Sequence, residues 1–243
     1  IDGDWRTGLH VAGVRLRALE GSPLAVLESI TAESVSVEGD LIGFVRNWKH
    51  LELLGTVRAT NPVVRLDVTV PSTPSEDTGP LRLPLIPRVI VTNGDLTIRL
   101  AADTLRFEDI ELDGSATKTA PLTVRTTASA DEWSARVDGA VVRESETSVG
   151  VVAAIPEGIA RGVDLTLDEL KGTWSPKQTR IESGSLTVGP NHLTPRSVVL
   201  SFGDEGFEAG GNIAFDLVDV QDAYRAVSAF SSTQDPGSSK DTA

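Results

Sequence analysis

The chain has 243 residues, of which 40% are hydrophobic and 23% charged, so it has the composition of an ordinary globular domain and global disorder is excluded. Its 35 acidic residues outnumber 22 basic ones and give a formal net charge of -13. A chain this acidic repels nucleic-acid phosphates, so we expect no nucleic-acid partner.

Cysteine and methionine are both absent from the sequence. Without cysteine there is no disulfide, no thiolate metal site and no cysteine nucleophile. Because the chain begins at Ile1 without an initiator, we expect either a signal peptide or membrane anchor upstream, or a piece cut from a longer protein. No apolar run approaches the roughly 18 residues that a membrane span requires. We therefore expect these residues to lie outside the membrane, in an extracytoplasmic space.

Alternation of apolar and polar residues is the dominant pattern, and it is typical of strands with one buried face. It is clear in Val64–Val70, where every second residue is apolar, and it recurs along much of the chain. The clearest further runs are 122–125, 133–141, 163–167, 198–202 and 207–217. These runs predict a mostly β fold of long, twisted antiparallel strands, forming a taco, a sandwich or an open groove.

Turn chemistry is strongest at Asn93-Gly94. Both residues tolerate positive φ, as a type I′ turn requires, and the turn would place Val91 opposite Leu96. The sequence therefore predicts a tight antiparallel hairpin here.

Two segments change the phase of their alternation. In 105–112 the apolar residues move from odd to even positions at Glu108-Asp109, and 181–188 changes likewise at Ser183-Gly184. One extra residue in a strand restores its apolar face and increases its twist. We therefore predict β-bulges at both places.

Two short segments have helical rather than strand spacing. Asp40–His50 has Asp40 as its N-cap, and Val220–Phe230 is the second. Both are too short to be stable alone and should pack on the sheet through one apolar stripe. The expected stripes are Leu41, Phe44, Val45 and Trp48 in the first helix, and Val220, Tyr224, Val227 and Phe230 in the second.

The alternation predicts a single domain over residues 1–230. The Pro-rich loop 71–80 is its best internal boundary, and alternation resumes directly after it. The Ser, Asp and Gly residues of 231–243 predict a flexible tail or linker.

No catalytic motif is present, neither a nucleophile elbow nor a phosphate-binding glycine loop, so we expect no enzyme and no cofactor. His10, His50 and His192 are far apart, and we expect no metal site. Asp216, Asp219 and Asp222 could bind a divalent cation, but the spacing of a calcium loop is missing. Acids at a helix N-terminus explain them better.

Large apolar side chains are the best candidates to line the interior of the sheet. Trp48 lies on the first expected helix and Trp133 on the apolar side of a strand, and both suit a core or groove lining better than a ligand-stacking role. The full candidate set for a groove or core is Trp48, Trp133, Phe207, Ile213 and Phe215.

Several segments resemble AsmA-like envelope proteins, a family that includes TamB-like and YhdP-like members. They are Leu27–Val37, the helical insertion 40–50, the Asn-Pro element within 57–66, the Asn-Gly element within 87–98 and the glycine-marked strand 207–217. The resemblance implies a periplasmic protein tethered to the inner membrane by an N-terminal helix. It also implies a β-sheet groove that conducts phospholipid.

Two functions remain open at this point. The first is a non-enzymatic AsmA-like scaffold, an accessory subunit docked on a respiratory, photosynthetic or envelope membrane complex. This function is favoured because the chain is short and its Val, Leu and Ile residues could fill a narrow sandwich. The second is a phospholipid-handling groove. A packed interior would favour the scaffold, and a continuous apolar surface would favour the groove.

Overall fold

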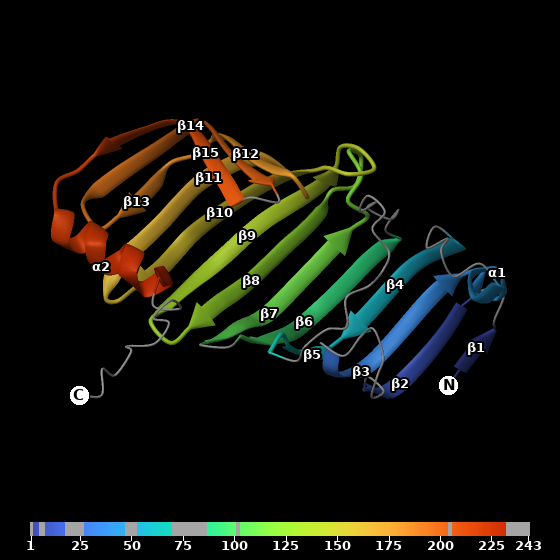
Figure 1. Cartoon of the computed structure of the whole chain (residues 1–243). Coiled ribbons are helices and arrows are strands. Elements are labelled where there is room, and N and C mark those ends of the chain that lie inside the picture. Colours follow the sequence, from blue (N-terminus) through green and yellow to red (C-terminus); the bar gives the residue numbers. More distant parts are fainter. Residues whose placement is uncertain are drawn as a thin grey trace, which may run out of the picture.

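The computed structural model describes residues 2–4, 8–17, 27–46, 53–69, 87–100, 103–203 and 206–231. These residues form one mixed sheet of 15 strands with two short helices, which confirms the mostly β class (Figure 1). The expected loop 71–80, the tail beyond Ser231 and Trp48 lie outside the described residues. The strands that flank the loop, β5 and β6, pair directly with each other.

The strands are mostly long. They are β1 (Asp2–Asp4), β2 (Gly8–Leu16), β3 (Leu27–Gly39), β4 (Leu54–Thr60), β5 (Val63–Asp67), β6 (Arg88–Arg99), β7 (Thr104–Gly114), β8 (Leu122–Ala130), β9 (Trp133–Arg143), β10 (Val149–Ala160), β11 (Val163–Ser175), β12 (Gln178–Ser183), β13 (Leu186–Val188), β14 (Asn191–Gly203) and β15 (Gly206–Asp216). The helices are α1 (Leu41–Arg46) and α2 (Val220–Ser231).

Most strands pair with their sequence neighbours, in the order β1-β2-β3-β4-β6-β7-β8-β9-β10-β11-β12-β14-β13, with β5 between β3 and β6 and with β15 on β14. Figure 1 shows one long twisted sheet whose C-terminal part curls round, with α2 at that end. The expected antiparallel pairing holds except that β4 and β5 both run parallel to β6. The chain between Asp67 and Arg88 is long enough for the crossover that a parallel pair needs.

The hairpin predicted at Asn93-Gly94 is wrong. Both residues lie inside the continuous strand β6, where Asn93 has φ 55° and the register with β7 shifts on either side of Gly94. The positive φ therefore forms a bulge instead of a turn. The parallel neighbour explains this, because the link between β4 and β5 has the same conformation at Asn61, with φ 48°. The Asn93 side-chain amide donates a hydrogen bond to Asn61 Oδ1 at 2.8 Å.

The predicted bulge at Glu108-Asp109 is confirmed. Asp109 has φ 53°, and two residues of β7 oppose one of β8, since Glu108 pairs with Thr127 and Glu111 with Arg125. At Ser183-Gly184 the ladder is interrupted altogether, because β12 ends at Ser183 and β13 begins at Leu186. Apolar residues on both sides of each interruption keep the same face of the sheet.

These irregularities belong to one line that crosses the sheet. Its positive-φ members, which we call the bulge line, are Gly13, Asn61, Asn93, Asp109 and Ser197, with φ between 48° and 63°. The register places neighbouring members at the same level of adjacent strands, as Thr60 opposite Thr92 and Gly94 opposite Ile110 demonstrate. The pairings of β10 with β9 and β11 shift at the same level, next to Ile155. One extra residue per strand resets the alternation without turning the strand over.

The register defines two faces of the sheet. The apolar face contains, in one rung from β2 to β8, Val11, Val35, Ala59, Val91, Leu112 and Val124. The polar face has Arg, Thr, Ser and acidic residues at the alternate positions. Trp133 and Leu165 also lie on the apolar face, on β9 and β11.

The main cluster of buried side chains among the described residues lies at the C-terminal end of the sheet. Its members are Ala160, Val163, Leu165, Val188, Ala226 and Ala229, each at most 6% exposed. α2 supplies the two alanines and contacts β10, β11 and β13. Small side chains allow the helix to approach the sheet closely.

Both predicted helices form. α1 begins after Asp40, whose Oδ1 accepts a hydrogen bond from the Gly43 backbone N at 2.9 Å, as the N-cap prediction requires, and residues 47–50 of the predicted helix lie outside the described residues. α2 faces the sheet through Ala226 and Ala229, so most of its predicted stripe was wrong: Val220, Tyr224 and Val227 are 65–73% exposed, and only Phe230 packs on the sheet, against Trp133. The stripe rule favoured the largest apolar side chains, whereas close packing against β10 and β11 required the smallest.

Candidate functional site

The open part of the apolar face is the main candidate site. On β2 to β8 its aliphatic side chains are mostly half-buried, and large hydrophobic residues below 9% exposure occur only at α1 and in the α2 core among the described residues. Side chains in a packed two-layer core would be almost fully buried. The described part of the chain therefore has no second layer over these strands. The face is a continuous apolar surface, because the bulge line keeps both halves of each strand in phase.

The predicted lining residues fall into two groups. Trp133 lies on the apolar face next to the core, and its ring packs on that of Phe230 from α2 with centroids 5.3 Å apart. Ile213 and Phe215 lie on the same face, on the outer strand β15, and are 51% and 66% exposed. Phe207 pairs with Phe202 near the start of β15, and Trp48 lies outside the described residues. The structure thus joins Trp133 to the covered end and leaves Ile213 and Phe215 uncovered.

Asn191 anchors the covered end, and the sequence patterns gave no indication of it. The residue is fully buried, and its side-chain amide donates to the carbonyl oxygens of Val188 and Asp219 at 3.0 and 2.8 Å. Its Oδ1 accepts from the backbone N atoms of Val218 and Asp219, both at 2.8 Å. This one side chain fixes the segment that leads into α2. Its position after Gly189-Pro190, a typical turn, was the only available signal.

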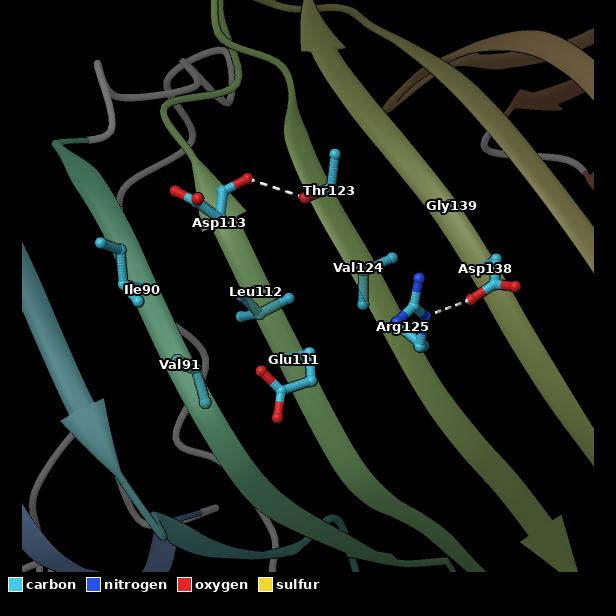
Figure 2. A pocket seen from close by; sticks show the side chains of 10 residues that line it. All are labelled: Ile90, Val91, Glu111, Leu112, Asp113, Thr123, Val124, Arg125, Asp138 and Gly139. Atoms are coloured by element: carbon cyan, nitrogen blue, oxygen red, sulfur yellow. Dashed lines mark hydrogen bonds and ion pairs between the residues drawn. The ribbon is translucent and has the colours of Figure 1, made fainter.

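A depression of about 540 Å³ lies over β6 to β9 (Figure 2). Its polar lining comes from Glu111, Asp113, Thr123, Arg125 and Asp138. Arg125 Nε lies 3.0 Å from Asp138 Oδ1, and Thr123 donates to the Asp113 carbonyl at 3.0 Å. Glu111 accepts a hydrogen bond from the Asn93 backbone at 3.1 Å. The charged side chains here are already engaged with one another.

One carboxylate of this depression is held by an ion pair. Arg88 donates two hydrogen bonds of 3.0 Å to the Asp113 carboxylate, and these lower the pKa of Asp113 from its ordinary 3.8. The same contact raises the pKa of the Arg88 guanidinium. Asp113 therefore stays ionised near neutral pH and is no proton donor there.

The remaining sequence candidates have structural roles or lie outside the described residues, as His50 does, and His192 pairs in register with Asp216. Asp219 acts as the N-cap of α2, since its Oδ1 accepts from the backbone N of Gln221 at 2.8 Å and of Asp222 at 3.2 Å. His192 Nδ1 lies 3.0 Å from Thr187 Oγ1. Within the described ranges, no three His or acidic side chains gather in a way that could hold a metal ion.

Comparison of the chain with protein-family models, with curated proteins and with solved structures gives no match. Among the described residues, neither helix has the length and apolar character that a membrane crossing would need. The functional argument therefore depends on the surfaces of the chain itself.

Proposed function

We propose that the chain is an extracytoplasmic, AsmA-like domain whose open apolar face binds the acyl chains of lipids. One observation supports this above all: the aliphatic side chains from β2 to β8 form a continuous face that the described residues cover only in part. Each methylene that moves from water onto such a surface contributes up to about 0.8 kcal/mol when fully buried. Contact along several strands is then sufficient to hold a long acyl chain.

Two neighbouring residues of β6 provide a matched test. Val91 lies on the apolar face and Ile90 on the polar face, so Val91→Asp introduces a carboxylate against bound acyl chains and Ile90→Asp does not. We expect Val91→Asp to weaken binding of a fluorescent fatty acid at least about tenfold and to remove phospholipid that co-purifies with the chain. Ile90→Asp should retain both.

The stability of both variants would be measured by denaturant unfolding, so that a loss of binding through unfolding is recognised. Equal lipid binding by the wild type and by a folded Val91→Asp variant would reject the proposal. So would wild-type protein that neither binds the fatty acid nor carries lipid.

The scaffold function, which the sequence alone favoured, is supported by one observation. The junction of β15 and α2 exposes Ile213, Phe215, Leu217, Val218, Val220 and Tyr224, each by 46–73%. Exposed apolar patches of this kind often mark protein contacts. A membrane complex would then dock here and attach the chain to the membrane.

A photo-crosslinking residue at position 215 distinguishes the two functions, with position 208 on the opposite face of β15 as the control. A protein adduct from 215 alone would support the scaffold. A phospholipid adduct from 215 would support the lipid function.

A further inference from the structure

The polar face contains a row of exposed arginines along one margin of the sheet. Arg15 and Arg17 lie at the end of β2, Arg65 lies on β5, Arg99 ends β6, and Arg106 lies near the start of β7. We call these five residues the arginine margin. All lie on the same side of the bulge line. The chain has a net charge of -13, so five arginines on one margin form a locally basic surface on an acidic protein.

The register places small hydroxyl residues next to these arginines. Arg15 pairs with Thr31, Arg65 lies between Ser29 and Thr97, and Thr97 pairs in turn with Arg106. The backbones of Arg65 and Arg106 therefore lie two strands, or about 9–10 Å, apart. Two hollows of about 280 and 270 Å³ lie between them, the first lined by Arg15, Arg17 and Arg65 and the second by Arg65, Arg99 and Arg106.

The arginines of the margin differ in their ion pairing from the arginines on the other half of the same face. Across the bulge line Arg58 pairs with Glu38 at 3.6 Å, Arg88 with Asp113 at 3.0 Å and Arg125 with Asp138 at 3.0 Å.

On the margin itself only Arg99 has a carboxylate partner within the described residues, Asp67 at 3.4 Å, and Glu28 is the one acid that lines the hollows. As far as the described residues go, four guanidinium groups are thus available to an external anion. Arginine matches phosphate geometry with two parallel donors.

The apolar face meets the arginine margin at the same strand ends. Each margin arginine has an aliphatic neighbour in the sequence: Leu16 lies between Arg15 and Arg17, Leu66 follows Arg65, Ile98 precedes Arg99 and Leu105 precedes Arg106. Because successive residues of a strand point to opposite faces, phosphate donors and acyl-chain contacts lie back to back along one margin. Leu16 is 54% exposed, so its side chain is accessible to an acyl chain.

We propose that the arginine margin binds the phosphate groups of anionic phospholipids in a bilayer, and that lipid reaches the apolar face across this margin. The acyl part of this inference rests on the proposed function, while the headgroup part does not. An acidic protein would also satisfy the charge, but it would not use the aliphatic residues behind each arginine.

The test is flotation of the chain with vesicles of phosphatidylcholine alone or mixed with phosphatidylglycerol. Wild-type protein should bind only the mixed vesicles, and added salt should weaken the binding. Each arginine near an anionic surface contributes about fivefold, so Arg65→Gln/Arg106→Gln should lower binding roughly 25-fold. Arg58→Gln/Arg88→Gln removes the same charge from paired arginines of the same face and should lower it far less.

Three outcomes would overturn the inference: equal loss in the two double variants, equal binding to both kinds of vesicle, or no vesicle binding by the wild type, as an acidic protein partner would predict. Displacement by inorganic phosphate but not by chloride of equal ionic strength would indicate a site for free phosphate instead.

Fatty-acid binding, measured without vesicles, separates this inference from the proposed function. It should survive Arg65→Gln/Arg106→Gln, and Val91→Asp should abolish it while leaving vesicle flotation intact.

Discussion

The two ends of the apolar face have the same strand chemistry and different burial. At the C-terminal end α2 covers the face, and Val163, Leu165 and Val188 are 5–6% exposed. From β2 to β8 valines and leucines in equivalent positions are only half-buried. Alternation in the sequence therefore specifies which side of a strand is apolar, but a separate element decides whether that side becomes core or surface.

The largest expected effect concerns the anchor of the covered end. Asn191→Leu keeps the approximate size of the side chain but leaves the backbone N atoms of Val218 and Asp219 without their acceptor. Since each unsatisfied buried group costs about 1–3 kcal/mol, we expect a loss of about 4 kcal/mol in the free energy of unfolding. Hydrogen exchange should increase in α2 before it increases elsewhere.

Asn212→Leu is the control, because Asn212 is exposed on β15 and should have almost no effect on unfolding. A similar effect of both substitutions would contradict the anchoring role of Asn191.

Two leucines test the difference between the ends directly. Leu165→Ala removes a side chain from the covered core and should cost about 3 kcal/mol. Leu66→Ala removes the same atoms from the open face and should cost about 1 kcal/mol, since its side chain is already half-exposed. Denaturant unfolding of both variants measures the contrast. If the two costs are equal, something beyond the described residues covers the open face.

The smallest effect concerns the exposed pair Arg88–Asp113 in the open half. The folded-state pKa of Asp113 lies below its ordinary 3.8, so the pair contributes stability above that value. The contribution is lost as the pH falls through the lowered pKa. Asp113→Asn should therefore lower the unfolding midpoint slightly at neutral pH, and the difference from the wild type should shrink as the pH falls below 3.8. A difference that persists in acid would exclude this ion pair as its source.

The apolar face could be predicted from the sequence, because period-two alternation is a local property of each strand. The Asn93-Gly94 hairpin could not be distinguished from a bulge in the same way. Positive φ at Asn93 suits both, and the choice depended on the parallel neighbour at Asn61, which is distant in sequence. The face that α2 presents to the sheet was missed for a similar reason: how closely two elements approach is a property of both.

For the candidate surfaces, too, local sequence properties could be predicted, and properties that depend on a neighbouring strand or helix could not. The margin was readable in principle, because arginine and an aliphatic residue are adjacent at Arg65-Leu66, at Ile98-Arg99 and at Leu105-Arg106. That these pairs lie on neighbouring strands became evident only from the register. Trp133, by contrast, was correctly placed on the apolar face of its strand, yet it belongs to the covered end because α2 brings Phe230 to it.

The bulge line also limits how such a chain can change its length over evolution. Loss of Asp109 alone would put either Leu105 and Phe107 or Ile110 and Leu112 on the polar face, because strand positions alternate. A single-codon deletion at this level is therefore harmful, whereas a two-codon deletion preserves phase. Relatives of this chain should show gaps of even length near these positions.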